Sequence, residues 1–284
     1  MTEHRGVAAR GAYGLALPDL RGADALLQPV PAGWPEWRIA HRARGEGEPD
    51  ELDMLGPDEA RLALGGGGWV EVERERSLST LVLHERPGDA EIVHPYLALT
   101  AAVTARWNGW QCFHAGAVVV DGKAWAVIGD KGAGKSSALG WFALRSEAQM
   151  LTDDVLVVNA DGAGIAGPRC VDLRGDMATH LGAGEPLGVV GARERWRLQV
   201  GPSPSEVPLT GWVKLAWGDR VEVERLGMEE RLRTVSGSLA LKVVPPNPAA
   251  LMDLVGLPGW RLTRPRELGS TEEAGERLVA TLAG

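Results

Sequence analysis

Cysteine is scarce in this chain, and its scarcity excludes two classes of protein. Only Cys112 and Cys170 occur among 284 residues, and no CxxC pair is present. Two thiols so far apart provide neither a disulfide framework nor a zinc site. A reducing cytoplasm is therefore the expected compartment.

Long apolar runs are also missing. No apolar segment approaches the roughly 20 residues that a membrane-spanning helix needs, and the first residues, MTEHRGVAARGAYG, are too polar for a signal peptide. Tyrosine and phenylalanine number two each, against eleven tryptophans spread over the whole chain. We expect these tryptophans to anchor the core, because their rings bury a large apolar area.

Positive charge is in deficit, and this argues against two kinds of partner. The formal net charge is −8, from 38 acidic and 30 basic residues. No broad positive field is available for nucleic acid or for an anionic membrane surface, so we expect neither partner. A local basic pocket for a nucleotide remains compatible with this charge. The chain is 44% hydrophobic, which suffices for a core in one large or two small domains.

Local patterns divide the chain into a β-rich first part, residues 1–89, and an α/β second part, residues 90–284. Residues 1–35 are rich in Gly and Pro without a clean period, so we expect a loose arm with one short strand. Between residues 36 and 86, four alternating or apolar segments predict antiparallel strands. These segments are Trp37–Ala43, Ala60–Leu64, Trp69–Glu73 and Leu78–His84.

In the second part, helix and strand signals alternate. The pair His94-Pro95 looks like a start signal for a helix that runs to Trp107, and Asp121-Gly122 predicts a hairpin turn. Strands are expected at Ala115–Val120, Ala124–Ile128, Met150–Asp153, Val155–Asn159, Trp212–Trp217 and Val221–Leu226. Further helices are expected at Ser136–Leu144, Ala249–Val255 and Glu272–Leu282.

The segment GDKGAGKS, Gly129–Ser136, fits the P-loop pattern G-x-x-x-x-G-K-[ST]. Gly132 and Gly134 let the backbone turn successive N–H groups inward as a nest for phosphate oxygens. The following helix N-terminus adds partial positive charge. Lys135 supplies a point charge for the β- and γ-phosphates, and the Ser136 hydroxyl supplies a Mg²⁺ ligand.

An apolar strand before this loop and a helix after it are the context that the motif requires, which argues against a chance match. We therefore predict that ATP or another nucleoside triphosphate binds there with Mg²⁺. The sequence does not separate ATP from GTP or pyrophosphate, because base contacts have no portable motif. The predicted nucleotide-binding residues are Gly129, Asp130, Lys131, Gly132, Ala133, Gly134, Lys135, Ser136 and Ser137.

The adjacent carboxylates Asp153 and Asp154 open a strand shortly after the loop. One can hold Mg²⁺, directly or through water, while the other accepts a proton from an attacking hydroxyl. We assign both to catalysis and place the metal on Ser136 and Asp154. A turn with two exposed aspartates is the alternative, because Asp-Asp is common in turns. The lysine of the glycine loop, close upstream, favours the functional interpretation.

This short distance between loop and doublet resembles the HPr kinase/phosphorylase family and its distant relative, ATP-dependent phosphoenolpyruvate carboxykinase. Three segments between Trp110 and Gly175 carry the resemblance: FHAGAVVVDGKAWAVIGDKGAGKSS, LTDDVLVV and the Arg-bearing GPRCVDLRG. They follow the family's order of a His-small dipeptide, two strands, the loop, the aspartate strand and an arginine. The resemblance implies a mixed α/β fold with an HPr-kinase-like P-loop core and a mainly antiparallel, β-rich N-terminal part.

The same resemblance implies a kinase that phosphorylates a serine or other hydroxyl on a protein or peptide, with His114 orienting or tuning one aspartate. A satisfied histidine at a strand end is the alternative for His114. Ser137 stands where full HPr kinases commonly carry Glu, and their glycine-rich segment after the arginine is not recognisable. Both departures favour the stand-alone HPr-kinase-like proteins, some of which phosphorylate a peptide serine. A modified-peptide precursor is thus a candidate partner, and a homo-oligomer is compatible because full HPr kinases form hexamers.

Arginines after the doublet are candidates for stabilising the transferred phosphoryl group, because a planar guanidinium suits its equatorial oxygens. We place Arg169 and Arg174 above Arg193, Arg195 and Arg197, whose alternation predicts one face of an exposed strand. Two other functions stay open: a small-molecule kinase on the same core, and a non-catalytic nucleotide-binding switch or assembly partner. The motifs do not separate a small-molecule kinase from a protein kinase. The aspartate doublet argues against the non-catalytic switch.

Overall fold

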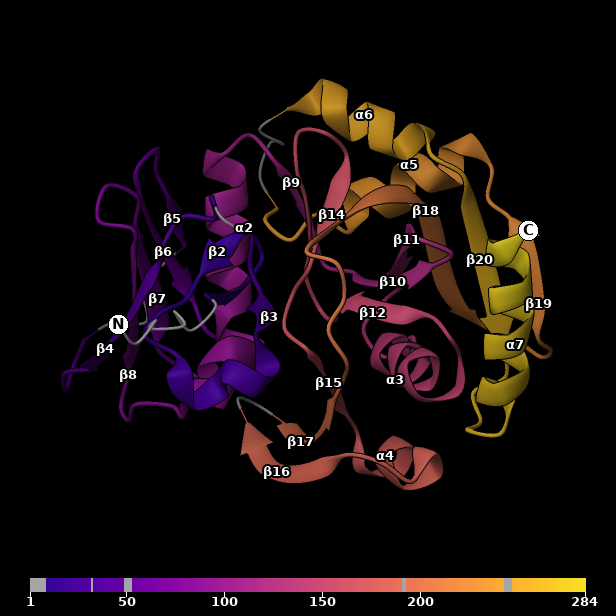
Figure 1. The fold of residues 1–284 in the computed structure, drawn as a ribbon, viewed down its shortest axis with the longest axis horizontal. Coiled ribbons are helices and arrows are strands. Elements are labelled where there is room, and N and C mark those ends of the chain that lie inside the picture. Colours follow the sequence, from indigo (N-terminus) through magenta and orange to yellow (C-terminus); the bar gives the residue numbers. More distant parts are fainter. Residues whose placement is uncertain (1–8, 32, 49–52, 191–192, 243–246) are drawn as a thin grey trace, which may run out of the picture.

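The computed structural model describes residues 9–31, 33–48, 53–190, 193–242 and 247–284. In these residues helices pack on sheets of both parallel and antiparallel strands, so the fold is mixed α/β, as expected. Figure 1 shows a five-stranded sheet at one end of the molecule, a nine-stranded sheet towards the other, and helix α2 (Leu97–Trp107) between them. None of the described helices combines the length and apolar character that crossing a bilayer requires.

The nine-stranded sheet has the order β12-β10-β11-β18-β14-β13-β9, with β20 paired to β18 and β19 paired to β20. Strands β11, β18 and β20 are parallel to one another, whereas the other pairs are antiparallel. The three parallel strands therefore end at the same edge of the sheet. The strands are β9 (Gln111–Phe113), β10 (Gly116–Val120), β11 (Lys123–Ile128), β12 (Gln149–Thr152), β13 (Leu156–Val158), β14 (Ala163–Ile165), β18 (Glu206–Trp217), β19 (Glu222–Arg225) and β20 (Gly259–Arg264).

Helices cover both faces of this sheet. Helices α3 (Lys135–Arg145) and α7 (Ser270–Ala283) share a hydrophobic cluster with Val118 of β10, whereas α5 (Met228–Gly237) and α6 (Pro248–Gly256) share another cluster with Val119. Because successive side chains of a strand point to opposite faces, β10 is buried throughout and reads as one apolar run.

The predicted hairpin between β10 and β11 is confirmed. The two strands pair antiparallel around Asp121 and Gly122, which have φ values of +49° and +73°. A two-residue turn with both central φ angles positive matches the twist of the strands that it joins. The chain therefore enters the glycine loop from the end of a strand that is fixed on both sides.

The five-stranded sheet contains the four strands expected between residues 36 and 86, and one prediction about it is wrong. Its order is β4-β8-β7-β6-β5. The pair β4 and β8 is parallel, whereas antiparallel pairing was expected throughout. Parallel pairing arises because β4 does not join its neighbour through a tight hairpin: the next strand along the chain, β5, lies at the opposite edge. The strands are β4 (Arg38–Ala43), β5 (Met54–Leu55), β6 (Glu59–Ala63), β7 (Trp69–Glu73) and β8 (Leu78–Leu83).

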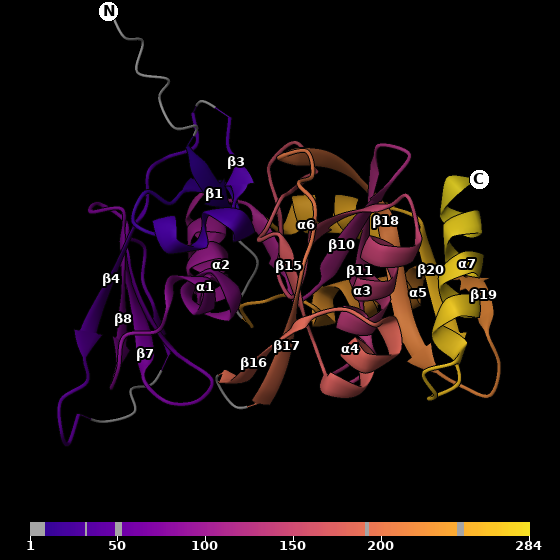
Figure 2. The same ribbon diagram turned by 60° about the horizontal axis from the view of Figure 1, so that its bottom comes forward.

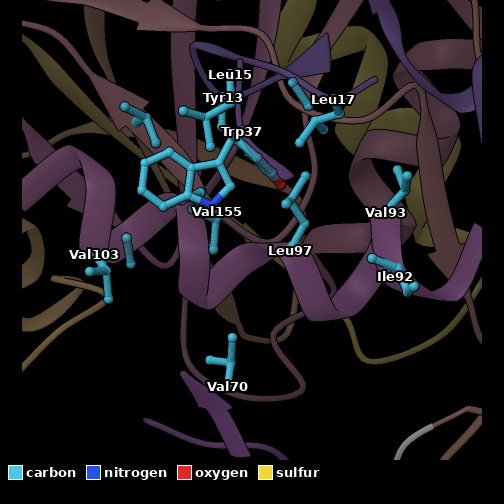
Figure 3. Close-up of a cluster of buried hydrophobic side chains, with 14 of the residues drawn as sticks. Tyr13, Leu15, Leu17, Trp37, Val70, Ile92, Val93, Leu97, Val103 and Val155 are labelled. Carbon is cyan, nitrogen blue, oxygen red and sulfur yellow. The ribbon is translucent and has the colours of Figure 1, made fainter. Parts of the chain in front are cut away.

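The expectation of a loose arm over residues 1–35 is wrong for the described residues 9–31. Strands β1 (Arg10–Ala12), β2 (Leu15–Ala16) and β3 (Gln28–Pro29) form a small sheet, and a 3-10 helix spans Arg21–Leu26. Figure 3 shows Tyr13, Leu15 and Leu17 in one buried cluster with residues of α2. These apolar side chains lie in turns and short strands, where the sequence has no regular apolar period. Their place in the core is therefore seen only in the packed structure.

This cluster also spans the expected division of the chain at residues 89 and 90. It contains Trp37 and Val70 from the first part, and Leu97, Val103 and Val155 from the second (Figure 3). The division into two domains stays a prediction. The shared core holds the β-rich part directly against α2 and the segment that carries the aspartate doublet.

A three-stranded sheet of β15 (Cys170–Leu173), β17 (Arg193–Gln199) and β16 (Glu185–Val190) was not predicted as such. Figures 1 and 2 show β16 and β17 between the five-stranded sheet and helix α4 (Gly175–Leu181). In β17 the expected alternation of arginines is present, but its setting differs from the expected exposed strand. This small sheet brings two of those arginines, Arg193 and Arg195, to the candidate site.

Candidate functional site

A cleft of about 870 Å³ opens at the edge where β11, β18 and β20 end. Ligands of open α/β sheets commonly bind outside the carboxyl ends of parallel strands. The glycine loop lines the cleft. The loop between β6 and β7, together with the start of α2, forms an apolar wall of the same cleft. Among the described residues its charged lining includes Asp130, Lys131, Lys135, Asp153, Asp154, Asp172, Arg174, Asp176, Arg193, Arg195, Arg264, Arg266 and Glu267.

The glycine loop lies between β11 and α3, as its flanking patterns predict. Gly132 and Gly134 have φ values of +86° and +88°, a conformation that side chains disfavour. Lys135 Nζ donates to the carbonyl oxygen of Gly129 at 2.9 Å, which folds the lysine back over its own loop. Burial is the largest influence on Lys135 and lowers its pKa, although the nearby aspartates oppose this.

Most of the loop residues predicted to bind nucleotide line the cleft. They are Asp130, Lys131, Gly132, Gly134, Lys135, Ser136 and Ser137. Ala133 is buried, and Gly129 contributes its carbonyl oxygen to the lysine. Their contacts with a nucleotide stay a prediction.

The aspartate doublet meets the loop at its serine. Ser136 Oγ lies 3.4 Å from both carboxylate oxygens of Asp153, which is only 4% exposed. Asp154 has a φ of +67° and donates its backbone N–H to Asp153 Oδ1 at 2.9 Å. The metal was expected on Ser136 and Asp154, whereas the structure brings Asp153 next to the serine. The turn directs the side chain of Asp154 towards the cleft, where it is 34% exposed.

Asp153 carries an unusually basic carboxylate. Burial first, and then the negative charges of Asp154 and Asp172, raise its pKa to about 7 from an ordinary value of 3.8. Two backbone N–H groups, those of Asp154 and Asp172, donate to it and oppose this rise only partly. A cation beside Ser136 would relieve the repulsion among these carboxylates.

His114 lies beside the doublet, where the resemblance places it. Its Nδ1 is 3.4 Å from Asp154 Oδ1, and its backbone N–H donates to the carbonyl of Ser238 at 2.6 Å. Partial burial lowers the pKa of His114, and Asp154 opposes that effect. The side chain is 52% exposed, so the ring can exchange protons with solvent. Its role in tuning Asp154 stays a prediction.

The arginines of β17 correct the expectation of an exposed strand face. Arg195 and Arg197 are only 9% and 6% exposed, because both bind Asp172 of the neighbouring strand. Arg197 holds both oxygens of that carboxylate at 2.9 and 3.1 Å, and Arg195 adds a bond of 3.0 Å. Burial alone would raise the pKa of Asp172, but His94 and the two arginines outweigh it and lower that pKa.

His94 is a buried site residue that sequence reasoning treated only as a helix start. Its Nε2 lies 3.6 Å from Asp172 Oδ2 and 4.0 Å from Asp153 Oδ2, between the two carboxylates. Its carbonyl oxygen accepts from Arg197 Nη2 at 2.7 Å. Burial lowers the pKa of His94, although the negative charges of Asp172 and Asp154 oppose this. The pair His-Pro before an apolar helix was its only signal in the sequence.

The two arginines ranked first in the sequence separate in space. Arg174 lines the cleft at the start of α4, and so does Arg193 of β17. Arg169 is not among the lining residues: its backbone is held between Leu26 and Val200, on the side of the N-terminal sheet. The structure thus places Arg174 and Arg193 in the lining of the cleft and Arg169 outside it, while the assignment of any arginine to the transferred phosphoryl group stays a prediction.

On the other side of the loop lies a group of aromatic and basic side chains that the sequence did not reveal. Trp217 ends β18, within the strand that was expected at Trp212–Trp217, and it lines the cleft. The guanidinium of Arg264 lies 4.5 Å from the centre of its ring, and that of Arg266 lies 6.0 Å away. Such cation–π contacts fix a guanidinium while leaving its edges free to bind.

The residues of the cleft fit a magnesium ion that arrives with phosphates. In the part of the chain that the structure describes, no three His, Cys, Asp or Glu side chains gather as a preformed metal cluster. Mg²⁺ commonly takes one or two carboxylates and completes its shell with waters and substrate phosphates. The hydroxyl of Ser136 and the carboxylate of Asp153 are hard oxygen donors at adjacent positions, so they suit such a shared site.

Comparison with known proteins adds little to this geometry. No protein-family model matches the chain, and no curated protein sequence matches it. Among solved structures it is similar to the Hpr(Ser) kinase/phosphatase from Coxiella burnetii, with 12% identity over 61% of this chain and 88% of that chain. The TM-score is 0.31. Likeness at this level does not establish a shared fold or function.

Proposed function

We propose that this protein is an ATP- and Mg²⁺-dependent phosphotransferase that moves the γ-phosphoryl group to a serine or other hydroxyl of a protein or peptide. One observation carries the proposal: a lysine-serine glycine loop and an aspartate doublet meet in one cleft, with Ser136 Oγ 3.4 Å from Asp153. A loop that only binds phosphate does not require a carboxylate beside its serine. The HPr-kinase-like core stays part of this proposal.

The glycine loop holds the phosphates. Its amides and Lys135 bind the β- and γ-phosphate oxygens, and Lys135 Nζ exchanges its bond to Gly129 for a bond to phosphate. Ser136 and Asp153 would hold the metal, which would neutralise phosphate charge when bound. Arg174 and Arg193, which line the same cleft, are the arginines that can reach the transferred group.

Asp154 serves as the base. It is partly exposed in the cleft, and His114 orients it from 3.4 Å. Asp154 accepts the proton of the acceptor hydroxyl while that oxygen bonds to the γ-phosphorus, and the bond from this phosphorus to the β-γ bridging oxygen breaks. The products are the phosphorylated hydroxyl and ADP.

The apolar wall of the cleft supports a peptide or protein acceptor. Leu64 follows β6, and Tyr96 and Leu99 lie at the start of α2; all three line the cleft. This wall lets side chains next to the acceptor hydroxyl pack against apolar surface.

The test is transfer of label from γ-labelled ATP, with Mg²⁺, to proteins and peptides of the source cell. Asp154→Asn should abolish transfer and leave nucleotide binding within about twofold, because it removes the base without touching the loop. Asp161→Asn, in an exposed turn, is the matched control and should transfer normally. Normal transfer by Asp154→Asn would refute the assignment of the base.

The same experiment separates the other functions. A labelled metabolite without any labelled protein would identify a small-molecule kinase. Tight nucleotide binding with neither hydrolysis nor transfer would identify a switch and refute the kinase.

A further inference from the structure

Arg264, at the end of β20, is a buried arginine in the wall of the cleft. It is 6% exposed and lies against the glycine loop. A Cβ atom placed on Gly134 would lie only 2.8 Å from Arg264 Nη2. The absence of a side chain at Gly134 thus lets the guanidinium approach the loop backbone.

The charge of Arg264 has no acidic partner among the described residues. Its Nη1 donates to two neutral acceptors, the carbonyl of Glu267 at 3.3 Å and Ser270 Oγ at 3.0 Å. By contrast, Arg261 on the same strand binds the carboxylates of Glu224 and Glu230. Burial lowers the pKa of Arg264, as expected for a cation without a counter-charge. A buried cation without an acidic partner is costly for the fold, and a bound anion would offset that cost.

The sheet order places Arg264 across the loop from the doublet. Strand β11, which leads into the loop, has β10 and then β12 on one side, and β18 and then β20 on the other. Asp153 follows β12 and Arg264 ends β20, so the two residues flank the loop from opposite sides. A polyphosphate on the loop amides would lie between them, with its negative charge towards Arg264.

We propose that Arg264 is an anion subsite that binds a phosphate oxygen of a polyphosphate held by the glycine loop. The identity of that ligand as a nucleoside triphosphate rests on the proposed function, whereas the subsite itself does not. Nη2 is the binding group, since Nη1 is engaged with Ser270 and Glu267. The ring of Trp217 holds the plane of the guanidinium in place.

The experiment measures binding of ATP and of inorganic tripolyphosphate by calorimetry, together with thermal unfolding with and without ligand. Arg264→Gln should bind both ligands about 10- to 100-fold more weakly, because it loses a charge-assisted hydrogen bond. Its melting temperature without ligand should stay unchanged or rise, because a buried charge without a partner is removed. Arg261→Gln is the matched control on the same strand: it should keep both affinities and melt slightly lower.

Two results would overturn the inference while the proposed function stands. One is wild-type affinity for tripolyphosphate in Arg264→Gln. The other is a lower melting temperature of ligand-free Arg264→Gln, together with a ligand-induced rise in melting temperature as large as in the wild type. That result would show that Arg264 has a purely structural role. If the wild-type protein bound neither ligand, the proposed function would fail together with the subsite.

Discussion

Asp153 makes the metal-free protein sensitive to rising pH, and Asp153→Asn should remove that sensitivity. Its carboxylate is buried beside Asp154 and Asp172, so the folded state favours the protonated form and the pKa rises to about 7. In the unfolded chain the same carboxyl ionises near its ordinary value of 3.8. A group with a raised folded pKa stabilises the fold below its unfolded pKa and loses that contribution as pH rises through its folded pKa. The window of loss therefore runs from about pH 4 to about pH 8.

The size of the effect follows from the two pKa values. One pKa unit corresponds to about 1.4 kcal/mol, so complete ionisation of Asp153 costs the folded state about 4 kcal/mol. About 3 kcal/mol of this falls between pH 5 and pH 8. At about 2 °C per kcal/mol for a chain of this size, the melting temperature should fall by about 6 °C over that range from this group alone.

The assay is thermal unfolding by circular dichroism in EDTA, at intervals from pH 5 to pH 8, for the wild type and Asp153→Asn. The variant should gain about 6 °C on the wild type between these limits, because an amide does not ionise. Asp161→Asn, exposed in a turn, should follow the wild type throughout. A constant difference between Asp153→Asn and the wild type across the range would refute the reasoning.

Three further predictions test other parts of the site. Asp172→Asn leaves the buried guanidiniums of Arg195 and Arg197 without their carboxylate. It should lower the free energy of unfolding, measured by urea denaturation, by about 3–5 kcal/mol, and a loss below about 1 kcal/mol would contradict the importance of this ion-pair network. His114→Gln should slow transfer about 100-fold at unchanged nucleotide affinity, because the ring contacts Asp154; an unchanged rate would remove it from the mechanism. Gly134→Ala should weaken nucleotide binding more than tenfold by calorimetry, and more than Gly132→Ala does. Both glycines have a positive φ, but only a side chain at Gly134 would meet the guanidinium of Arg264. Equal losses of affinity in the two variants would show that backbone strain alone is responsible.

The glycine loop and its flanks could be predicted because their determinants are local. The hairpin turn at Asp121, the strand before the loop and the helix after it each depend on residues next to one another in the sequence. The doublet was found in the same way, from its strand edge and its nearness to Lys135. Which of its two carboxylates faces Ser136 depends instead on the φ of +67° at Asp154, and the Asp-Asp pattern, although common in turns, does not specify which residue takes that conformation.

The burial of charge could not be predicted in this manner. Arg195 and Arg197 alternate as residues on an exposed face do, and only their pairing with Asp172 across the small sheet takes them out of solvent. His94 becomes a site residue through the same network, from the segment that precedes α2. Each case depends on a contact between segments far apart in the sequence, where local periodicity carries no information.

The walls of the cleft come from segments as distant in the sequence as Leu64 and Leu268, and this distribution links the ligand to folding. Bringing such segments together costs chain entropy, because long loops must close. Only the completely folded chain joins the glycine loop, strand β20 and Arg264 in one cleft. A polyphosphate ligand should therefore stabilise only the completely folded molecule, and it should protect both sheets from proteolysis together rather than one before the other.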